Sequence, residues 1–599
     1  MIYHCEDHTC NYWDEGEKLP ERCPQCGRKL LRANEADMTG DDWTALGNTL
    51  WYAEASDKKR MVDCFRKAAY LGSAWGVCNL GICMEQGNGV EADPVQAFWL
   101  YQQAVEMGSL NAVCCLGVCY QYGIGTAPDA EKAAELYCKA AEYGSPRGQM
   151  LLARAFHDGI GVEADAAEAM HWVRAAAYQR YGEGMHRLGV CYEYGDGVEQ
   201  NWEHTVHWFR EAAESGVSVA MTDLGYCYEK GCGVEQSWEQ AFPWYRRSAE
   251  CGNPVSMSNL GLCYQMGYGV EQNWQEAIKW YEQGAQCGNL QSMHNLACCY
   301  EGGEGVEQNE DRAFYWYRRS AEGGNGSAMC NLGRCYKRGY GVEQNWQEAV
   351  KWYEQGAQCG NLQSMHNLAC CYEHGEGVEQ NMTEAIRWYT AAAEGGNADD
   401  MYELGWQYDH GEGVEQDMKK AICWYERAAE QNHPAAMNSL GECYAMGRGV
   451  PRDLETAMEW YRRAAELGEA MADYNMGWHL EQAGKLSEAY AHYRKAADGN
   501  DDSAWWALGR FYENGVVVAQ DGKEARRCYE TGEKLGSVKC KMRLARCKLL
   551  GIGGRREKKA GLDLCRQALE LAKESSEKED YGYEAEMNLL RRTIAENES

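Results

Sequence analysis

Four cysteines near the N-terminus have the residue type and the spacing of metal ligands. Cys5 and Cys10 form one pair, and Cys23 and Cys26 form a second pair after the intervening residues 11–22. Thiolates are soft ligands that hold Zn²⁺ in a tetrahedron, and four of them leave no open position on the metal for a substrate. The sequence therefore predicts a structural zinc ion bound by these four thiolates.

The two cysteine pairs differ in how strongly they indicate a metal. The second pair has two residues between its thiolates and Gly27 directly after it, which lets the backbone curl around an ion. The first pair has four intervening residues, and His4 and His8 are alternative ligands beside it. A segment of about 30 residues has too small a core to fold alone, so bound zinc would contribute most of its stability.

Residues 1–32 resemble the zinc-ribbon and rubredoxin-like knuckles that are often appended to bacterial proteins. The resemblance implies a head that binds protein or nucleic acid. The chemistry of zinc-bound thiolates also allows a head that senses oxidation by losing its zinc. Its basic residues are interspersed with a larger number of acidic ones, so no basic patch emerges. A nucleic-acid-binding or redox-sensing head stays an alternative function for this segment.

A second short motif has the residues of a nucleophilic site. Ser56 and Lys59 match the Ser-x-x-Lys element of penicillin-binding enzymes, but no Ser-Asp-Asn or Lys-Thr-Gly element accompanies them. The motif is expected to fall between helices. Metalloprotease, phosphate-loop and dinucleotide fingerprints are absent from the sequence as well. We therefore predict a protein that is not an enzyme.

The acidic composition restricts the class of partner. The chain of 599 residues has 59 Lys and Arg against 91 Asp and Glu, a formal net charge of −32. Such a field repels phosphate backbones, so we expect a protein or peptide partner, with a basic one favoured, rather than nucleic acid. No signal-peptide pattern opens the sequence and no run is long enough to span a bilayer, so we predict a cytoplasmic protein without membrane contact. The 30 cysteines are then expected to be reduced.

A Leu-Gly or Leu-Ala step recurs along most of the chain at a constant interval. From Leu80 to Leu440 the interval is 36 residues each time, and about fifteen units follow when shorter intervals near the ends are included. The outer steps lie at Leu46, Met476, Leu508 and Leu544. One such unit cannot bury its apolar face alone, so neighbouring units must stack into a solenoid.

Each unit is predicted to be a helical hairpin. Its first helix has apolar residues at helical spacing, for example at Met293, Leu296, Ala297 and Tyr300. Gly follows at two positions, such as Gly303 and Gly305, where a positive φ or a close helix approach would require it. The second helix then begins with a capping box. The boxes are Asn273 with Glu276, Asn345 with Glu348 and Asn381 with Glu384.

These repeats resemble the Sel-one-like repeat family, which is related to the tetratricopeptide repeat. The shared pattern is Leu-Gly, Tyr, Gly-x-Gly-Val, Lys-Ala and Trp-Tyr with trailing Ala-Ala, and it covers roughly residues 38–570. The resemblance implies an all-α, right-handed α/α solenoid of about fifteen repeats. Some secreted relatives are labelled β-lactamases because they bind penicillin, which keeps a penicillin-binding hydrolase as an alternative. We divide the chain into a knuckle at 1–32, a solenoid at 33–570 and a C-terminal capping helix or tail at 571–599.

Three columns of the repeat have a structural interpretation. Nine cysteines beside the core tyrosine are expected to be small buried hydrophobes. Secreted family members carry one disulfide per repeat, but that pattern needs a second regular cysteine column, and here the second one is irregular. The tryptophan column is expected to pack between helices, and the glutamate column to form a solvated edge. The cysteines are Cys83, Cys119, Cys191, Cys227, Cys263, Cys299, Cys335, Cys371 and Cys443.

Function is assigned to the columns that vary between repeats. Two positions on the first helix change freely while the core columns stay constant. We predict that they line a groove that holds an extended peptide or another protein, and that the chain is a scaffold or adaptor. The partner-binding residues proposed from these columns are His186, Tyr226, Arg334, Tyr402 and Trp406, of which we expect the last four to be exposed.

Overall fold

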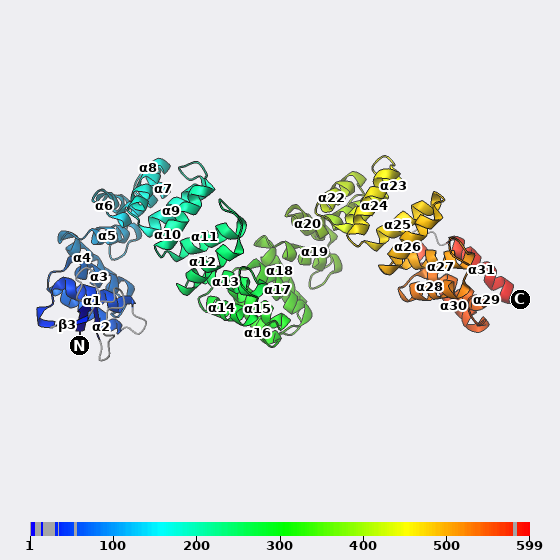
Figure 1. Cartoon of the computed structure of the whole chain (residues 1–599), viewed down its shortest axis with the longest axis horizontal. Coiled ribbons are helices and arrows are strands. Elements are labelled where there is room, and N and C mark those ends of the chain that lie inside the picture. The colour runs from blue at the N-terminus through cyan, green and yellow to red at the C-terminus, as the bar shows by residue number, and fades with distance from the viewer. Residues whose placement is uncertain are drawn as a thin grey trace. The chain divides into compact units, whose positions relative to one another are not determined.

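The computed structural model describes residues 2–5, 13–15, 30–33, 35–52, 57–578 and 584–598 (Figure 1). The chain divides into two compact units, Met1–Gln308 and Asn309–Ser599, called unit 1 and unit 2 below. The boundary falls inside one sequence repeat, between its first and second helices.

Unit 1 begins with three short strands. They are β1 (Ile2–Cys5), β2 (Trp13–Glu15) and β3 (Leu30–Ala33), and they form an antiparallel sheet in the order β2-β1-β3. Ile2 lies opposite Glu15 on one side and opposite Ala33 on the other. The 3₁₀ helix η1 (Glu35–Asp37) leads from the sheet into the helical repeats.

The remainder of unit 1 is helical. Its helices are α1 (Gly40–Tyr52), α2 (Lys58–Tyr70), α3 (Ala74–Gln86), α4 (Pro94–Glu106), α5 (Leu110–Tyr122), α6 (Ala130–Glu142), α7 (Pro146–Asp158), α8 (Ala166–Tyr178), α9 (Gly182–Tyr194), α10 (Trp202–Glu214), α11 (Ser218–Lys230), α12 (Trp238–Glu250), α13 (Pro254–Met266), α14 (Trp274–Gln286) and α15 (Leu290–Gly302).

Unit 2 has the same composition. Its helices are α16 (Glu310–Glu322), α17 (Gly326–Arg338), α18 (Trp346–Gln358), α19 (Leu362–His374), α20 (Met382–Glu394), α21 (Ala398–His410), α22 (Met418–Glu430), α23 (Pro434–Met446), α24 (Leu454–Glu466), α25 (Ala470–Gln482), α26 (Leu486–Asp498), α27 (Asp502–Asn514), α28 (Gly522–Lys534), α29 (Val538–Leu550), α30 (Lys558–Lys578) and α31 (Glu584–Glu598).

Consecutive helices form the predicted hairpins. The hairpins run from α1–α2 to α13–α14 in unit 1 and from α17–α18 to α29–α30 in unit 2, and each packs on the next within its unit. The all-helical repeat solenoid expected from the 36-residue period is therefore confirmed, while the right-handed superhelix stays a prediction. Helix α30 runs across residue 570, where the sequence placed the start of a C-terminal cap.

Second helices begin as half of the predicted capping box. Asn273 Oδ1 accepts the backbone N–H of Glu276 at 3.1 Å, but the carboxylate of Glu276 lies 3.2 Å from Lys279 Nζ. The second bond of a capping box would join the N–H of Asn273 to the carboxylate of Glu276. This N–H instead donates to the carbonyl of Tyr264 at 2.8 Å. The same arrangement occurs at Asn345 and Asn381.

Most first helices end at glycine, for both of the reasons predicted. Gly303 has a φ of 73° and closes the helix by donating to the carbonyl of Cys299 at 2.9 Å. Gly305 has a φ of 72°, and a Cβ there would lie 2.5 Å from the Cβ of Trp274. One glycine thus supplies the left-handed turn, and the second also allows the turn to touch the preceding second helix.

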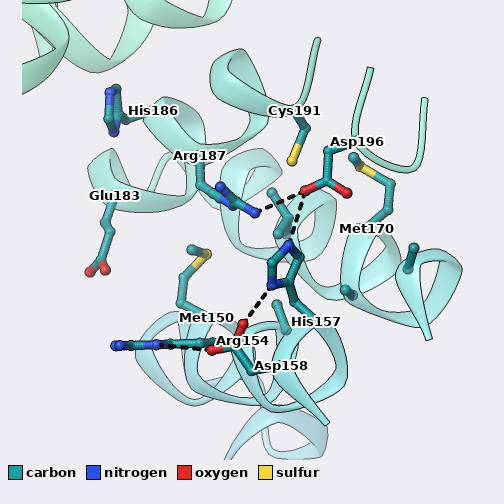
Figure 2. A pocket seen from close by; sticks show the side chains of 14 residues that line it. Met150, Arg154, His157, Asp158, Met170, Glu183, His186, Arg187, Cys191 and Asp196 are labelled. Carbon is teal, nitrogen blue, oxygen red and sulfur yellow. Dashed lines mark hydrogen bonds and ion pairs between the residues drawn. The ribbon is translucent and has the colours of Figure 1, made fainter. Parts of the chain in front are cut away.

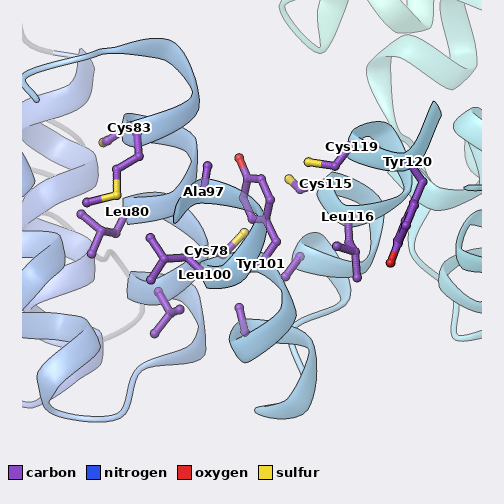
Figure 3. Packing of buried hydrophobic residues seen from close by; sticks show 14 of the residues in the cluster. Cys78, Leu80, Cys83, Ala97, Leu100, Tyr101, Cys115, Leu116, Cys119 and Tyr120 are labelled. Carbon is purple, nitrogen blue, oxygen red and sulfur yellow. The ribbon is translucent and has the colours of Figure 1, made fainter. Parts of the chain in front are cut away.

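The core runs through each unit along the first and second helices. Figure 3 shows Leu80, Cys83 and Tyr101 in the same packed layer as Cys115 and Leu116 of the next repeat. The glycine of the Leu-Gly step makes room for the core tyrosine, since a Cβ at Gly81 would lie 2.7 Å from the ring of Tyr101. The buried tyrosine hydroxyl still finds a partner, as Tyr101 donates to Glu85 at 2.6 Å.

The cysteine and tryptophan columns differ in depth. All nine column cysteines are buried, which confirms their interpretation as small core residues, and the described cysteines occur as thiols. The column tryptophans are only half-buried, and several carry a cation on their rings, such as Arg427 at 4.3 Å from the centroid of Trp424. The residue that follows each tryptophan takes the interior position; it is a tyrosine in seven of the nine repeats, as at Tyr425, and Val173 or Phe209 in the other two.

Candidate functional site

The five predicted partner-binding residues lie on first helices, as the repeat pattern required. His186 is on α9, Tyr226 on α11, Arg334 on α17, and Tyr402 and Trp406 on α21. Their exposure differs from the expectation: Tyr226 is 46% exposed, whereas Arg334, Tyr402 and Trp406 are half-buried. Three of the five line pockets, and these pockets are described in turn.

A pocket in unit 1, called pocket A, lies among α7, α8 and α9 and has a volume of about 360 Å³ (Figure 2). His157 stands at its centre, with Nδ1 2.6 Å from Asp158 and Nε2 3.5 Å from Asp196. Arg187 also reaches Asp196, at 2.9 Å. Contact with His157 lowers the pKa of the Asp158 carboxyl. Charges of both signs are therefore already paired within pocket A.

His186 is on the rim of pocket A and connects two repeats. Its Nε2 lies 2.7 Å from Asp223 on α11, and its ring stacks on Phe209 with centroids 5.4 Å apart. Through the contact with Asp223, His186 connects the neighbouring first helices α9 and α11. Tyr226 lies outside both pockets, where Lys230 approaches its ring at 5.8 Å.

A larger pocket in unit 2, called the α21–α25 groove, has a volume of about 670 Å³. It is lined chiefly by three successive first helices, α21, α23 and α25. The two variable columns supply much of its surface. They contribute Tyr402, Asn438 and Tyr474 from one column and Trp406, Glu442 and Trp478 from the other.

Aromatic rings form the ends of the α21–α25 groove. Trp406 stacks on His410 with centroids 4.3 Å apart, and Tyr402 stacks on His433 at 5.0 Å. At the other end Trp478 is 38% exposed. Burial raises the pKa of Tyr474 to about 12, so its hydroxyl stays protonated and can donate a hydrogen bond to a bound group.

The charged lining of the α21–α25 groove is mainly acidic. It consists of the carboxylates of Asp409, Glu442 and Glu469 and the guanidinium of Arg448. Arg448 lies 2.9 Å from buried Asp409 and 3.9 Å from Glu442. Glu469 is the N-cap residue of α25 without a side-chain capping bond, so its carboxylate is available to the groove. A cationic side chain would meet two carboxylates that Arg448 does not fully neutralise.

The remaining predicted residues are not brought together with these pockets. Arg334 lies on α17 near Cys330 and Tyr353, outside the α21–α25 groove. Cys10, Cys23, Cys26 and Ser56 lie outside the described residues, and of Cys5 only the backbone in β1 is described. Lys59 lies in the first turn of α2, whose N-cap is Asp57, and not between helices.

Two absences hold for the part of the chain that the structure describes. In it, no group of three or more His, Cys, Asp or Glu side chains is placed to hold a metal ion. Among the same residues, no helix combines the length and the apolar character needed to cross a bilayer.

The acidic residues of the α21–α25 groove were not recognised in the sequence. Asp409 occupies the repeat position at which a Glu or Gln in several other repeats accepts the core tyrosine hydroxyl, as Glu229 does for Tyr245 at 2.7 Å. Two features of the sequence could have indicated this acidic site: the shorter Asp at this position, and Arg448 in the next repeat.

Stacked helical hairpins with a groove across successive first helices define a helical repeat protein of the solenoid class. The model of the Sel1 repeat matches fourteen segments of this chain, and the chain belongs to the Sel1 repeat family. The matched segments are residues 76–109, 112–145, 146–181, 182–217, 218–253, 254–289, 290–325, 326–361, 362–397, 398–433, 434–469, 470–501, 504–537 and 538–573.

Solved structures include similar repeat proteins. A protective antigen of uropathogenic Escherichia coli strains, described as displaying an SLR fold, is 32% identical; the match covers 75% of this chain and 97% of that one, with a TM-score of 0.53. A Sel1 repeat protein from Oxalobacter formigenes is 28% identical over 52% of this chain and 90% of that one, with a TM-score of 0.40. Comparison with curated proteins finds no significant match.

Proposed function

We propose that the chain is a non-catalytic scaffold that holds a basic segment of a partner protein in the α21–α25 groove. The observation that carries the proposal is the coincidence of the variable columns with this groove. Packing of the repeats alone does not require Trp406 and Trp478 to share the α21–α25 groove with Glu442 and Glu469. Aromatic rings beside carboxylates favour a segment that contains Lys or Arg.

The size of the α21–α25 groove suits a few side chains of an extended segment. Its volume of about 670 Å³ lies in the range of ligand-binding clefts. Met446 and Met471 are exposed at its edge and offer adaptable apolar contact to such a segment. The acidic net charge of the whole chain adds long-range attraction for a basic partner.

A binding assay tests the proposal. Fluorescein-labelled short peptides rich in Lys and Arg are titrated with the full chain, and acidic peptides of equal length serve as the comparison. We expect the basic peptides to bind and their affinity to fall as salt is added. Trp406→Ala should weaken binding by roughly 30-fold, the effect of losing an aromatic anchor worth about 2 kcal/mol.

A matched pair of charge changes separates the groove from general attraction. Glu442→Gln removes a carboxylate inside the groove, whereas Glu415→Gln removes one from the exposed acidic edge. We expect weaker binding for the first variant and unchanged binding for the second. Equal effects of the two variants, or equal binding of acidic peptides, would contradict the groove as the binding site.

A further inference from the structure

Three side chains of unit 2 form a line from α21 to α19. Asp400 Oδ1 lies 2.7 Å from His366 Nδ1, and His366 Nε2 lies 3.6 Å from Cys370 Sγ. The carboxylate accepts from Nδ1, which directs the other ring nitrogen to the sulfur. A proton can therefore be shared between Cys370 Sγ and His366 Nε2, as in sites that use a cysteine nucleophile.

Asp400 is an exception in its own repeat column. In the other repeats from Gly76 to Cys540 the equivalent positions hold only small residues, and Asp400 itself is fully buried. Examples of that column are Ala220, Ser256, Ser292, Ala328, Ser364, Ala436 and Ala472. Among the described residues its Oδ2 has no hydrogen-bond partner. A buried carboxylate destabilises the fold unless a charged or hydrogen-bonding partner compensates it. The presence of Asp400 therefore indicates a role beyond packing.

The charges around His366 favour a protonated ring. Hydrogen bonds to Asp400 first, and to Cys370 second, raise the pKa of His366 to about 10. Glu403 and Glu373 add negative charge nearby. The Tyr389 hydroxyl lies 3.4 Å from Cys370 Sγ and donates its own proton to Glu373 at 2.6 Å. The Nε2–H of His366 is therefore the donor that faces the sulfur.

The thiol is also reachable. Cys370 is half-buried, and the side chain of His366 is 27% exposed. The neighbouring Cys371, by contrast, is fully buried, and burial raises its pKa to about 12. Reagents in solution can thus approach one of the two adjacent cysteines.

We propose that Cys370 is a thiol-modification site, primed by His366 and Asp400 for exchange with low-molecular-weight disulfides. Its Sγ attacks one sulfur of the disulfide, and a new S–S bond forms as the old one breaks. The leaving sulfur departs with the electron pair and takes the proton that Cys370 gave to His366. Cys370 is oxidised to a mixed disulfide, and the leaving sulfur is reduced to a thiol.

The chain contains its own control for this site. His294 and Cys298 occupy the same positions in a nearly identical repeat, with 3.9 Å between ring nitrogen and sulfur. Ala328 has the same spacing from His294 as Asp400 has from His366, so this second site lacks the carboxylate. Cys298 is exposed, so accessibility alone predicts that it reacts faster than Cys370. The proposal predicts the opposite order.

Two reagents test the site on the full-length chain, oxidised glutathione for exchange and iodoacetamide for alkylation. Trypsin separates the two cysteines into residues 280–312 and 352–387, each of which contains three cysteines. Fragmentation of each peptide in the mass spectrometer assigns the modification to a single cysteine and gives the rates of Cys370 and Cys298. We expect Cys370 to react with either reagent at least about tenfold faster than Cys298.

Asp400→Ala is the decisive variant, because alanine occupies this position in other repeats and the fold should tolerate it. It should slow Cys370 to the rate of Cys298 or below, and His366→Gln should do the same. Circular dichroism checks that both variants stay folded. A Cys370 that reacts no faster than Cys298, or that keeps its rate in Asp400→Ala, would overturn the proposal.

Discussion

The guanidinium of Arg448 lies 2.9 Å from the carboxylate of Asp409, which is only 4% exposed. Asp409 belongs to α21, and Arg448 to the turn after α23, so the pair joins two neighbouring repeats at the wall of the α21–α25 groove. Removal of the cation would leave a buried carboxylate without its charged partner. Such groups destabilise the folded state.

Arg448→Met should therefore lower the stability of unit 2. We expect a loss of about 1–3 kcal/mol in the free energy of unfolding, at the lower end because the side chain of Arg448 is itself 39% exposed. Urea denaturation followed by circular dichroism measures the loss. The same variant should bind basic peptides more tightly, since the groove loses its one guanidinium.

Arg462→Met is the matched control for this pair. Arg462 forms its ion pairs with Glu459 and Glu466 on the surface of α24, and such pairs contribute little. We expect no measurable change in its denaturation midpoint. The double variant Asp409→Asn with Arg448→Met should recover part of the lost stability. A loss in Arg462→Met as large as in Arg448→Met would contradict the assignment.

Gly261→Ala should be destabilising, although alanine is the better helix former. A Cβ at this position would lie 2.4 Å from the ring of Tyr281, which is fully buried and cannot move aside. We expect a loss of about 1–3 kcal/mol from overpacking. Thermal unfolding of the full chain is the measurement.

Gly302→Ala tests whether the loss comes from the clash and not from glycine chemistry. Gly302 also lies in a helix of unit 1, but the nearest atom to its Cβ would be 3.4 Å away, on the flexible side chain of Glu304. We expect this variant to be neutral or more stable by up to about 1 kcal/mol. Equal destabilisation by both variants would refute the steric explanation.

Alkaline pH should weaken the fold through the cysteine column. Burial raises the pKa of Cys263 from its ordinary 9.0 to about 12, and that of Cys227 likewise. Above pH 9 the unfolded chain loses these protons while the folded chain keeps them, so folding stability falls as pH rises toward 12. We expect a lower urea midpoint at pH 10 than at pH 8.

A triple alanine variant shows whether these thiols cause the effect. Alanine is compatible with the column, because Ala155 occupies it in one repeat and is buried. Replacement of Cys227, Cys263 and Cys299 should lower the midpoint at pH 8 but reduce its further fall at pH 10. An unchanged pH dependence would show that other groups, such as the buried tyrosines, are responsible.

Zinc binding by the N-terminal cysteines is a separate prediction. We expect one zinc ion per chain after purification in zinc-containing buffer and dialysis, measured by elemental analysis. Cys23→Ser and Cys26→Ser should each lose the metal, because three thiolates no longer close the tetrahedron. Cys251→Ser, on an exposed helix end, should retain it. A metal-free wild-type chain would contradict the prediction.

The repeat architecture could be predicted in detail because its determinants are local. Glycine at Gly303 and the side-chain cap at Asn273 act within one or two turns of their own helices. The reciprocal arm of the capping box was wrong, because the Asn273 N–H is taken by Tyr264 across the turn, a contact that helix-capping rules do not include. The exposure of Trp406 was also overestimated, since its neighbour His410 covers one face of the ring.

The sequence by itself determined the period, the two helices of each repeat, and the buried Leu, Cys and Tyr columns. These follow from helical spacing and from the need of each hairpin to bury its apolar face on the next. Only the tertiary structure decided which variable residues meet. Trp406 and Trp478 share one groove, and His366 finds Asp400, because the stacking of repeats sets the distance between first helices. That distance depends on side-chain packing between neighbouring repeats, and the periodicity of a single repeat does not predict this packing.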